Sequence, residues 1–559
     1  MDSDQPDGNT AGDGPPAGLE RLRWDNRFVD ELPVDPSTEI RPRQVPGACS
    51  SRVQPVRTSA PALVAWSPEL SDELGLAPEL WTEHPVLMAE ILSGNRLLPG
   101  MDPHAACYGG HQFGHWAGQL GDGRAISLGE LVGPDGASHT LQLKGAGPTP
   151  YSRGADGFAV LRSSVREFLC SEAMHHLGIP TTRALSLVVT GDKVIRDMFY
   201  DGNPRPEPGA IVCRVAPSFI RFGNFQILAA RQEVELLKRL ADFTVDHYFP
   251  ELAAIHGPDD PSRYPALFAE VARTTLAMVL GWMRVGFVHG VMNTDNMSIH
   301  GLTIDYGPYG WLEGFDPGWT PNTTDATHRR YRYGQQPLVA QWNLLQLANA
   351  LVPLTGETEP FQAALEGYGE DLGRDERAMW RAKCGLDQVA DTGAADELVG
   401  ELFRLLTAVE TDLTLFFRGL ARVVATGDAS RPLPTDERTD GDLVAPLADA
   451  YYPDDGAERM REPTAAWLRR HLALAASDGR PAAERAQAMD RVNPRYVLRN
   501  YLAQLAIDAA EENDFSQVVE LLDVVRRPYD DQPGYERYAA KRPEWARERA
   551  GCSQLSCSS

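Results

Sequence analysis

The sequence predicts an α+β protein with two lobes, in which a β-rich lobe is followed by a helical one. Three observations indicate this order. Alternating apolar and polar residues, which are typical of strands, recur between residues 101 and 225. From residue 226 onward, apolar residues recur instead at helical spacing. A polar loop with several Asn and Asp residues, at 289–305, falls early in the helical lobe.

Composition and charge narrow the class of protein. The chain has 559 residues, of which 43% are hydrophobic, and this suits a globular protein with a large core. Its formal charge of -25 argues against a nucleic-acid partner or attachment to an anionic membrane. No run approaches the ~20 apolar residues of a membrane span, and the acidic N-terminus does not look like a targeting signal. Seven cysteines do not make a disulfide scaffold. We therefore expect a cytoplasmic protein.

We expect six segments along the chain. The first is rich in Asp, Gly and Pro, which is typical of disorder, and the last is short and contains two cysteines. The segments are a disordered N-terminus (1–20), an N-terminal extension (21–100), a β-rich lobe (101–225), a helical lobe that contains the polar loop (226–335), a helical C-terminal region (336–545) and a mobile tail with cysteines (546–559).

A hairpin is the first clear unit of the β-rich lobe. Its strands are expected at 125–131 and 140–144, joined by a turn with two glycines. Gly121 and Gly123, followed by Arg124, precede the first strand, where bare backbone N–H groups can approach a phosphate. As a Gly-rich motif this is weak, because the third glycine is missing. Nearby, His111 and His115 are interpreted as structural, because no third metal ligand is evident.

Lys144 closes the second strand of this hairpin, and a helix expected at 161–177 carries Glu167. A kinase uses this order of strand, lysine, helix and glutamate to hold the lysine on phosphate. Two further strands are expected at 185–190 and 193–197. Arg214 and Arg221 follow, and their planar guanidinium groups suit phosphate oxygens. A salt bridge between elements explains the two arginines equally well.

The polar loop matches the layout of a kinase catalytic loop. His289 and Asn296 fall on the H-G-D-x-x-x-x-N template, and Asp305 opens a turn that stands in for D-F-G. Asn296 and Asp305 would supply hard oxygen ligands for Mg²⁺. The template aspartate is replaced by Val291, although Asp295 could substitute for it. The alternatives are a decayed pseudokinase and an ordinary turn rich in Asp and Asn. The predicted fold is therefore protein-kinase-like, with an N-terminal extension and a large helical C-terminal part.

The C-terminal half reads as all-helical. Its clearest helices are expected at 339–351, 360–372, 376–384 and 397–415. The tail that follows contains Cys552 and Cys557. An exposed terminal cysteine is a candidate reactive thiol, and an inert one is the alternative.

Several long blocks of this sequence resemble the selenoprotein O (YdiU-like) family of protein adenylyltransferases. They are residues 108–125, 141–153, 289–297 and 493–502, and the ending Ser-Cys-Ser-Ser. The resemblance implies a kinase-like fold that binds ATP in a flipped orientation and transfers AMP to protein hydroxyls, with UTP as an alternative donor. It also implies Mg²⁺ or Mn²⁺ as the metal, and Ser, Thr or Tyr of proteins, some of them redox-related, as acceptors.

The resemblance also implies roles for individual residues. Asp295 would accept the proton, and Asn296 and Asp305 would bind the metal, with Asp305 also near ATP. The nucleotide contacts would be Gly121, Gly123, Arg124, Lys144 with its partner Glu167, Asp156, Gly157, Arg214 and Arg221.

The tail departs from the family pattern. Gln554 stands where a cysteine would precede Cys557 by three residues, so a local C-x-x-C switch is not expected, and a Cys552–Cys557 or longer-range disulfide stays open.

Two other functions remain open from the residues alone. A kinase that transfers the γ-phosphoryl group fits the loop template, but Val291 counts against it. A nucleotide-binding scaffold would not need Lys144, Glu167, Asp295, Asn296 and Asp305 together. Mostly on the strength of the family resemblance, we expect a nucleotidyltransferase.

Overall fold

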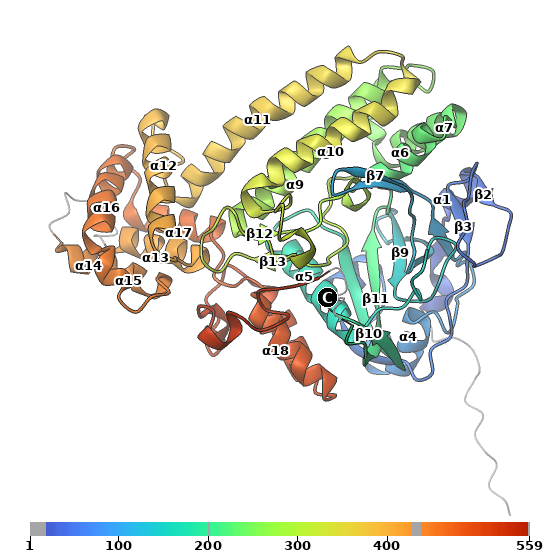
Figure 1. Cartoon of the computed structure of the whole chain (residues 1–559), viewed down its shortest axis with the longest axis horizontal. Coiled ribbons are helices and arrows are strands. Elements are labelled where there is room, and N and C mark those ends of the chain that lie inside the picture. The colour runs from blue at the N-terminus through green and yellow to red at the C-terminus, as the bar shows by residue number, and fades with distance from the viewer. Residues whose placement is uncertain (1–17, 199–201, 427–437, 557–559) are drawn as a thin grey trace, which may run out of the picture.

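The computed structural model describes residues 18–198, 202–426 and 438–556. Most of the segment expected to be disordered, residues 1–17, lies outside this part of the chain. The arrangement is α+β, with a sheet built from the N-terminal part and a helical C-terminal region, as the sequence predicted (Figure 1).

Nine strands in the described residues form one mixed sheet. Its order is β2-β3-β5-β8-β9-β11-β10-β4, and β1 pairs with β8. The predicted hairpin is present as β8 and β9, where Ala125 lies opposite Lys144. The strands are β1 (Arg23–Trp24), β2 (Val34–Asp35), β3 (Ser50–Arg52), β4 (Ala62–Trp66), β5 (His104–Ala106), β8 (Ala125–Val132), β9 (Ser138–Lys144), β10 (Arg183–Arg196) and β11 (Arg205–Ala216).

The sheet separates two apolar cores because side chains alternate between its faces. Ile211 and Cys213 of β11 join a core formed with the helices of the N-terminal extension, α2 (Pro68–Glu73), α3 (Pro78–Thr82) and α4 (Pro85–Leu92). Val212 points to the opposite face and joins the large core, which α5 (Leu161–His176) enters with Phe168. The predicted helix at 161–177 is therefore confirmed as α5, packed against the sheet.

The helical region is built around three long helices that lie side by side (Figure 1). They are α9 (Arg263–Val285), α10 (Gln336–Leu351) and α11 (Glu359–Lys383). Among the described helices, α9 alone is long and apolar enough to cross a membrane, yet it packs between α10 and α11 as a core helix. A second group of helices lies at the end of α11 far from the sheet. It consists of α12 (Thr392–Ala408), α13 (Leu413–Ala425), α14 (Asp440–Val444), α15 (Gly456–Arg459), α16 (Arg461–Ala476) and α17 (Ala482–Val492). Helices α18 (Asn500–Glu511) and α19 (Ser516–Val525) return to the sheet side and pack on α5.

Three element boundaries predicted from the sequence are wrong. The strands expected at 185–190 and 193–197 are one strand, β10, whose ladder with β11 shifts register between Val189 and Lys193. The helices expected at 360–372 and 376–384 are the single helix α11, because Gly373 does not interrupt its hydrogen bonds. The helix expected at 397–415 is divided into α12 (Thr392–Ala408) and α13 (Leu413–Ala425), because the carboxylate of Asp412 caps α13 at Leu415 N–H.

Lys383, at the end of α11, is a buried amine that ties three parts of the helical region together. Its Nζ donates to the carbonyl of Arg284 (2.7 Å) and to Oδ1 of Asn493 (2.7 Å), and it lies 4.2 Å from the ring centre of Phe417. Burial, assisted by the nearby Arg284 charge, lowers the pKa of Lys383 to about 7. A neutral amine has two N–H donors, and the two acceptors match them.

This lowered pKa predicts a pH-dependent stability. Between pH 7 and 10.5 the unfolded chain binds a proton at Lys383 that the folded chain does not, so the free energy of unfolding rises with pH across this window. We expect Lys383→Met to remove a rise on the order of 1 kcal/mol per pH unit. Urea unfolding of both proteins from pH 7 to 10 measures the difference. If the difference in the free energy of unfolding between the wild type and Lys383→Met does not change with pH, Lys383 remains charged in the folded protein.

Candidate functional site

A cavity of about 670 Å³ lies between the sheet and the helical region. Ten of the twelve residues predicted to form the site line it: Gly121, Gly123, Arg124, Lys144, Asp156, Gly157, Arg214, Asp295, Asn296 and Asp305. The other two, Glu167 and Arg221, lie just behind its wall and form ion pairs with Lys144 and Asp305. Predicted site residues as far apart in the sequence as Gly121 and Asp305 therefore line the same cavity.

Two glycines allow the loops on the sheet side to close around this cavity. Gly121 has a φ of +113°, and a Cβ there would lie 2.5 Å from the ring of Tyr151. Gly157 has a φ of +81°, and a Cβ there would lie 2.2 Å from the backbone of Gly147. A side chain at either position would therefore strain the backbone and clash. Asp156 lies beside Gly157, and Arg196, which the sequence did not single out, holds its carboxylate through two bonds of 2.7 Å.

Lys144 and Glu167 form the ion pair that the sequence predicted. The Glu167 side chain is only 2% exposed, and it also accepts a bond of 3.2 Å from Nη1 of Arg214. Burial lowers the pKa of Lys144, and the Glu167 carboxylate opposes part of that change. The lysine is therefore held at the cavity by a buried carboxylate on α5.

Asp305 lies between two buried guanidinium groups. Its Oδ1 accepts from Arg214 (2.6 Å) and its Oδ2 from Arg221 (2.5 Å). Burial alone would raise the pKa of Asp305, but Arg221, Arg214 and Lys144 together hold the pKa well below its usual range. Arg214 and Arg221 therefore form the salt bridges between elements that the sequence left open as an alternative. Their positive charges at the cavity are also what phosphate binding requires.

Asp295 is buried at the helical side of the cavity. Its Oδ2 accepts from Nε2 of Gln112 (3.2 Å), whereas its Oδ1 is buried without a hydrogen-bond partner. A Cβ on Gly110 would lie 2.6 Å from that Oδ1, so the strand β6 (Gly109–Gln112) approaches the carboxylate closely. Burial raises the pKa of Asp295 to about 6. Gln112 and Gly110 were not predicted as site residues, although the density of glycine around 109–123 was a signal for close backbone approach.

Asn296 and Asp305 present a donor set that suits Mg²⁺. Nδ2 of Asn296 donates to the carbonyl of Val291 (2.9 Å), which orients the carboxamide and leaves its oxygen to act as a ligand. The described residues contain no group of three or more His, Cys, Asp or Glu able to hold a metal by themselves. Mg²⁺ typically uses one or two protein oxygens and completes its shell with phosphate and water, so these residues fit it. The apolar Val291 lines the cavity where the kinase template has an aspartate.

The tail differs from the sequence-based expectation in its described part. Leu555 is fully buried, and its backbone bonds to Pro321 (3.0 Å) and Thr323 (2.8 Å) hold residues 546–556 against the loop that follows Asp305. Cys552 is 3% exposed, and burial raises its pKa to about 11. Of the two alternatives left open by the sequence, the structure therefore favours an inert thiol at Cys552. Cys557 and any disulfide to it lie outside the described residues.

Comparison with known proteins adds a family to this geometry. Residues 39–526 match the family model described as "Protein adenylyltransferase SelO". The chain is 59% identical over 544 residues to the "Protein nucleotidyltransferase YdiU" of Azoarcus sp. (strain BH72), covering 97% of this chain and 100% of that protein. It is 57% identical over 545 residues to the protein of the same name from Aromatoleum aromaticum, with the same coverage. A third, from Rhodopirellula baltica, is 57% identical over 545 residues.

Proposed function

The chain belongs to the SelO family and is a protein nucleotidyltransferase, and we propose that it transfers AMP from ATP to Ser, Thr or Tyr hydroxyls in the cavity described above. One observation carries the assignment of the site. Asp295 is buried in the cavity with an unpartnered carboxylate oxygen, whereas the kinase-template position is the apolar Val291. The proposed fold is protein-kinase-like. The cytoplasm as location, UTP as an alternative donor, Mn²⁺ as an alternative metal and redox-related protein substrates remain predictions.

Lys144, Arg214 and Arg221 are the proposed phosphate ligands. Arg214 and Arg221 are buried at or behind the cavity wall, and the Lys144 side chain is only 12% exposed. A positive charge in such a place is screened weakly and attracts a polyphosphate strongly. With ATP in the flipped orientation, these groups would neutralise the β- and γ-phosphates, which leave as pyrophosphate. In the structure, Arg214 and Arg221 both bind the Asp305 carboxylate. A bound phosphate would give each guanidinium group a further anionic oxygen to which it can donate.

Asn296 and Asp305 would hold Mg²⁺ beside the α-phosphate. Bound there, the metal supplies positive charge that offsets the negative charge of the reacting phosphate. The protein must keep the Asp305 carboxylate ionised for this role, and the arginine pair does so by holding its pKa well below the usual range.

The proposed chemical step is an in-line displacement at the α-phosphorus. The acceptor oxygen forms a bond to that phosphorus, and the bond from the phosphorus to the oxygen bridging toward the β-phosphate breaks. Pyrophosphate departs with the bonding electrons, and Asp295 takes the hydroxyl proton. Val291 is then no defect, because Asp295 lies at the cavity and can take this role.

Two labelled nucleotides test the reaction. Purified protein is incubated with Mg²⁺ and either α-³²P-ATP or γ-³²P-ATP, and label on protein is measured. AMP transfer predicts label on protein from the α-position only, with pyrophosphate released. Label from the γ-position only would replace this proposal with a kinase. ATP binding without label from either position, in the presence of a mixed protein extract as acceptor, would indicate a scaffold.

Asp295→Asn is expected to slow transfer while leaving the nucleotide bound. The amide keeps the shape of the side chain but cannot accept a proton, so kcat should fall by about 10²–10⁴-fold. The dissociation constant for ATP should change little, because the proposed phosphate ligands are elsewhere. Isothermal titration and the α-label assay measure the two quantities. A variant that retains its kcat would remove Asp295 from the proton transfer.

A further inference from the structure

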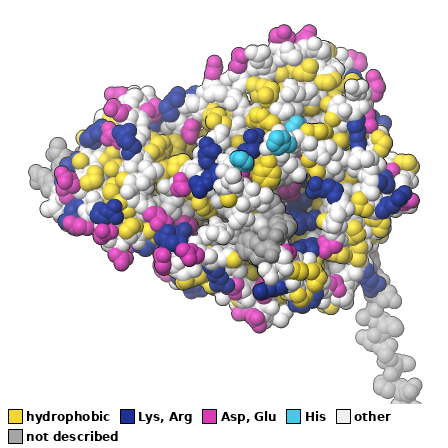
Figure 2. Space-filling model, in the orientation of Figure 1, with side chains coloured by type: hydrophobic (Ala, Val, Ile, Leu, Met, Phe, Trp, Pro, Cys, Tyr) yellow, Lys and Arg dark blue, Asp and Glu magenta, His cyan; other side chains and the backbone are white. Residues whose placement is uncertain are grey.

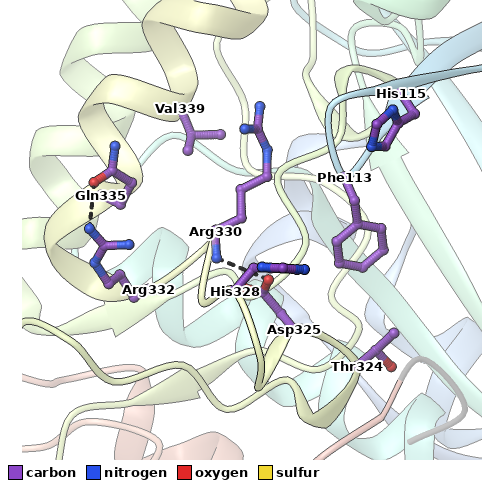
Figure 3. A pocket seen from close by; sticks show the side chains of 9 residues that line it. All are labelled: Phe113, His115, Thr324, Asp325, His328, Arg330, Arg332, Gln335 and Val339. Carbon is purple, nitrogen blue, oxygen red and sulfur yellow. Dashed lines mark hydrogen bonds between the residues drawn. The ribbon is translucent and has the colours of Figure 1, made fainter.

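A second cavity, of about 630 Å³, lies beside the first on the helical side. Its volume is within the range typical of ligand-binding sites. Figure 3 shows Phe113 and His115 at one side of it, Arg332 and Gln335 at the other, and Arg330 between them. The wall comes from the hairpin of β6 and β7 (His115–Gln119), the loop after Asp305 and the start of α10: Phe113, His115, Thr324, Asp325, His328, Arg330, Arg332, Gln335 and Val339.

The β6–β7 hairpin contributes neighbouring residues to both cavities, next to Asp295. Gln112 lines the nucleotide cavity and donates to Asp295, and the next residue, Phe113, lines the second cavity. The N–H of Phe113 donates to Oδ1 of Asn293 (3.1 Å) and to the hydroxyl of Tyr331 (3.0 Å). Because consecutive Cα atoms are about 3.8 Å apart, a polypeptide with its hydroxyl at Asp295 reaches the second cavity within a few residues.

The second cavity is lined by two arginines whose guanidinium groups form no ion pair among the described residues. Neither Arg330 nor Arg332 forms an ion pair within the described part of the chain, and Nε of Arg330 is buried without a hydrogen-bond partner. The Arg330 guanidinium lies 4.6 Å from the ring centre of Trp342, which holds it in place. Arg332 bonds only to neutral oxygens, of Arg329 (3.1 Å) and Gln335 (2.9 Å).

One carboxylate lies in the wall against the two guanidinium groups, so the wall keeps a net positive charge. Asp325 is 3% exposed, and its two oxygens accept from the backbone N–H groups of Arg330 (2.9 Å) and Tyr331 (2.7 Å). Figure 2 shows histidine side chains among Lys and Arg on this face, over the region where β7 and α10 lie in Figure 1. For a chain with a formal charge of -25, an open basic cavity is a local exception that favours an anionic ligand.

We propose that the second cavity binds an acidic segment of the acceptor polypeptide, next to the hydroxyl that receives AMP. This inference rests on the proposed function. Carboxylates of the acceptor would pair with Arg330 and Arg332, whose guanidinium groups can hold a carboxylate through two hydrogen bonds. Phe113 offers an apolar surface for the aliphatic part of the same side chains. The expected acceptor is therefore a Ser, Thr or Tyr with Asp or Glu within a few residues.

Three matched peptides test the charge preference. Each contains one Thr, flanked in turn by Glu, Gln or Lys at the same positions, and α-³²P-ATP reports the transfer of AMP. For the wild type, kcat/KM should be about ten-fold higher for the Glu peptide than for the Gln peptide, and lowest for the Lys peptide. Arg330→Glu should reverse the order, so that the Lys peptide becomes the better substrate. Arg332→Glu is the second variant, expected to act in the same direction.

Arg329→Glu is the matched control. Arg329 lies in the same loop and undergoes the same charge change, but its side chain is exposed outside the cavity and bonds to Gly318. It should keep the wild-type peptide order. The dissociation constant for ATP, measured in parallel, should stay within about two-fold of the wild-type value in the cavity variants, since the nucleotide contacts are elsewhere. That value shows that a variant has folded.

The outcomes separate this inference from the proposed function. If the wild type labels all three peptides equally and Arg330→Glu and Arg332→Glu leave this unchanged, the inference is overturned and AMP transfer stands. If the wild type puts no α-label on any peptide or on protein in an extract, the proposed function itself fails. If Arg330→Glu loses the preference for the Glu peptide but Arg332→Glu keeps it, as Arg329→Glu should, then Arg332 does not contact the acceptor.

Discussion

Asp305→Asn is expected to abolish the proposed AMP transfer, with a loss in kcat of at least about 10³-fold. The amide removes the negative charge that would bind the metal, and it removes the counter-charge of Arg214 and Arg221. A neutral side chain between two guanidinium groups cannot restore either role. The α-label assay on protein acceptors measures the effect, with ATP binding followed in the same preparations.

Asp316→Asn is the matched control for this loss. Asp316 lies eleven residues further along the same segment, is exposed, and accepts a bond from the backbone N–H of Gly318 (2.7 Å). It should retain wild-type transfer. A loss of less than about ten-fold in kcat is typical of residues that do not act in the transition state. If Asp305→Asn lost no more than this, Asp305 would not be a metal ligand.

Arg499→Met is expected to cause the largest loss of stability, about 3–5 kcal/mol. Nη1 of Arg499 donates to Glu313 (2.6 Å) and Asp412 (2.7 Å), and all three side chains are at most 7% exposed. Removing the cation leaves two buried carboxylates without a counter-charge, and the repulsion between them adds to the cost of burial. Asp412 also caps α13, so the change spreads to that helix.

Arg495→Met provides the comparison, because it alters the same residue type four positions earlier. Arg495 pairs with Asp531, whose side chain is 73% exposed, and such a surface pair contributes about 0–1 kcal/mol. Chemical unfolding followed by tryptophan fluorescence measures both variants. Equal destabilisation by the two substitutions would show that the Arg499 cluster contributes no more than a surface pair.

The sequence predicted the parts of the site that depend on local order. Lys144 ends a strand and Glu167 lies on the next helix, and this order alone brings them together across the sheet. Asn296 and Asp305 flank a short turn, so their proximity also follows from local structure. The loop at Gly121 could be predicted for a similar reason, because glycine there marks close backbone approach, whereas Gly157 was expected from the family resemblance alone.

The rest of the site depends on contacts between residues far apart in the sequence. Gln112 reaches Asp295 across 183 positions, and no periodicity in either segment encodes that contact. The helix boundary at Asp412 was missed because apolar spacing continues through it, and the buried partner Arg499 that stabilises the break lies 87 positions later. The buried tail was missed because its small polar composition resembles that of a mobile end, whereas its partners are the backbone groups of Pro321 and Thr323.

The packing of α18 and α19 on α5 has a consequence for how this enzyme can be controlled. In protein kinases the helix that carries the glutamate partner of the lysine swings in and out, and this movement turns catalysis on and off. Here that helix has the sheet on one side and α18 and α19 beside it, so an outward swing would first have to displace these two helices. We therefore expect the Lys144–Glu167 pair to stay assembled, so that control would act through the supply of nucleotide and acceptor.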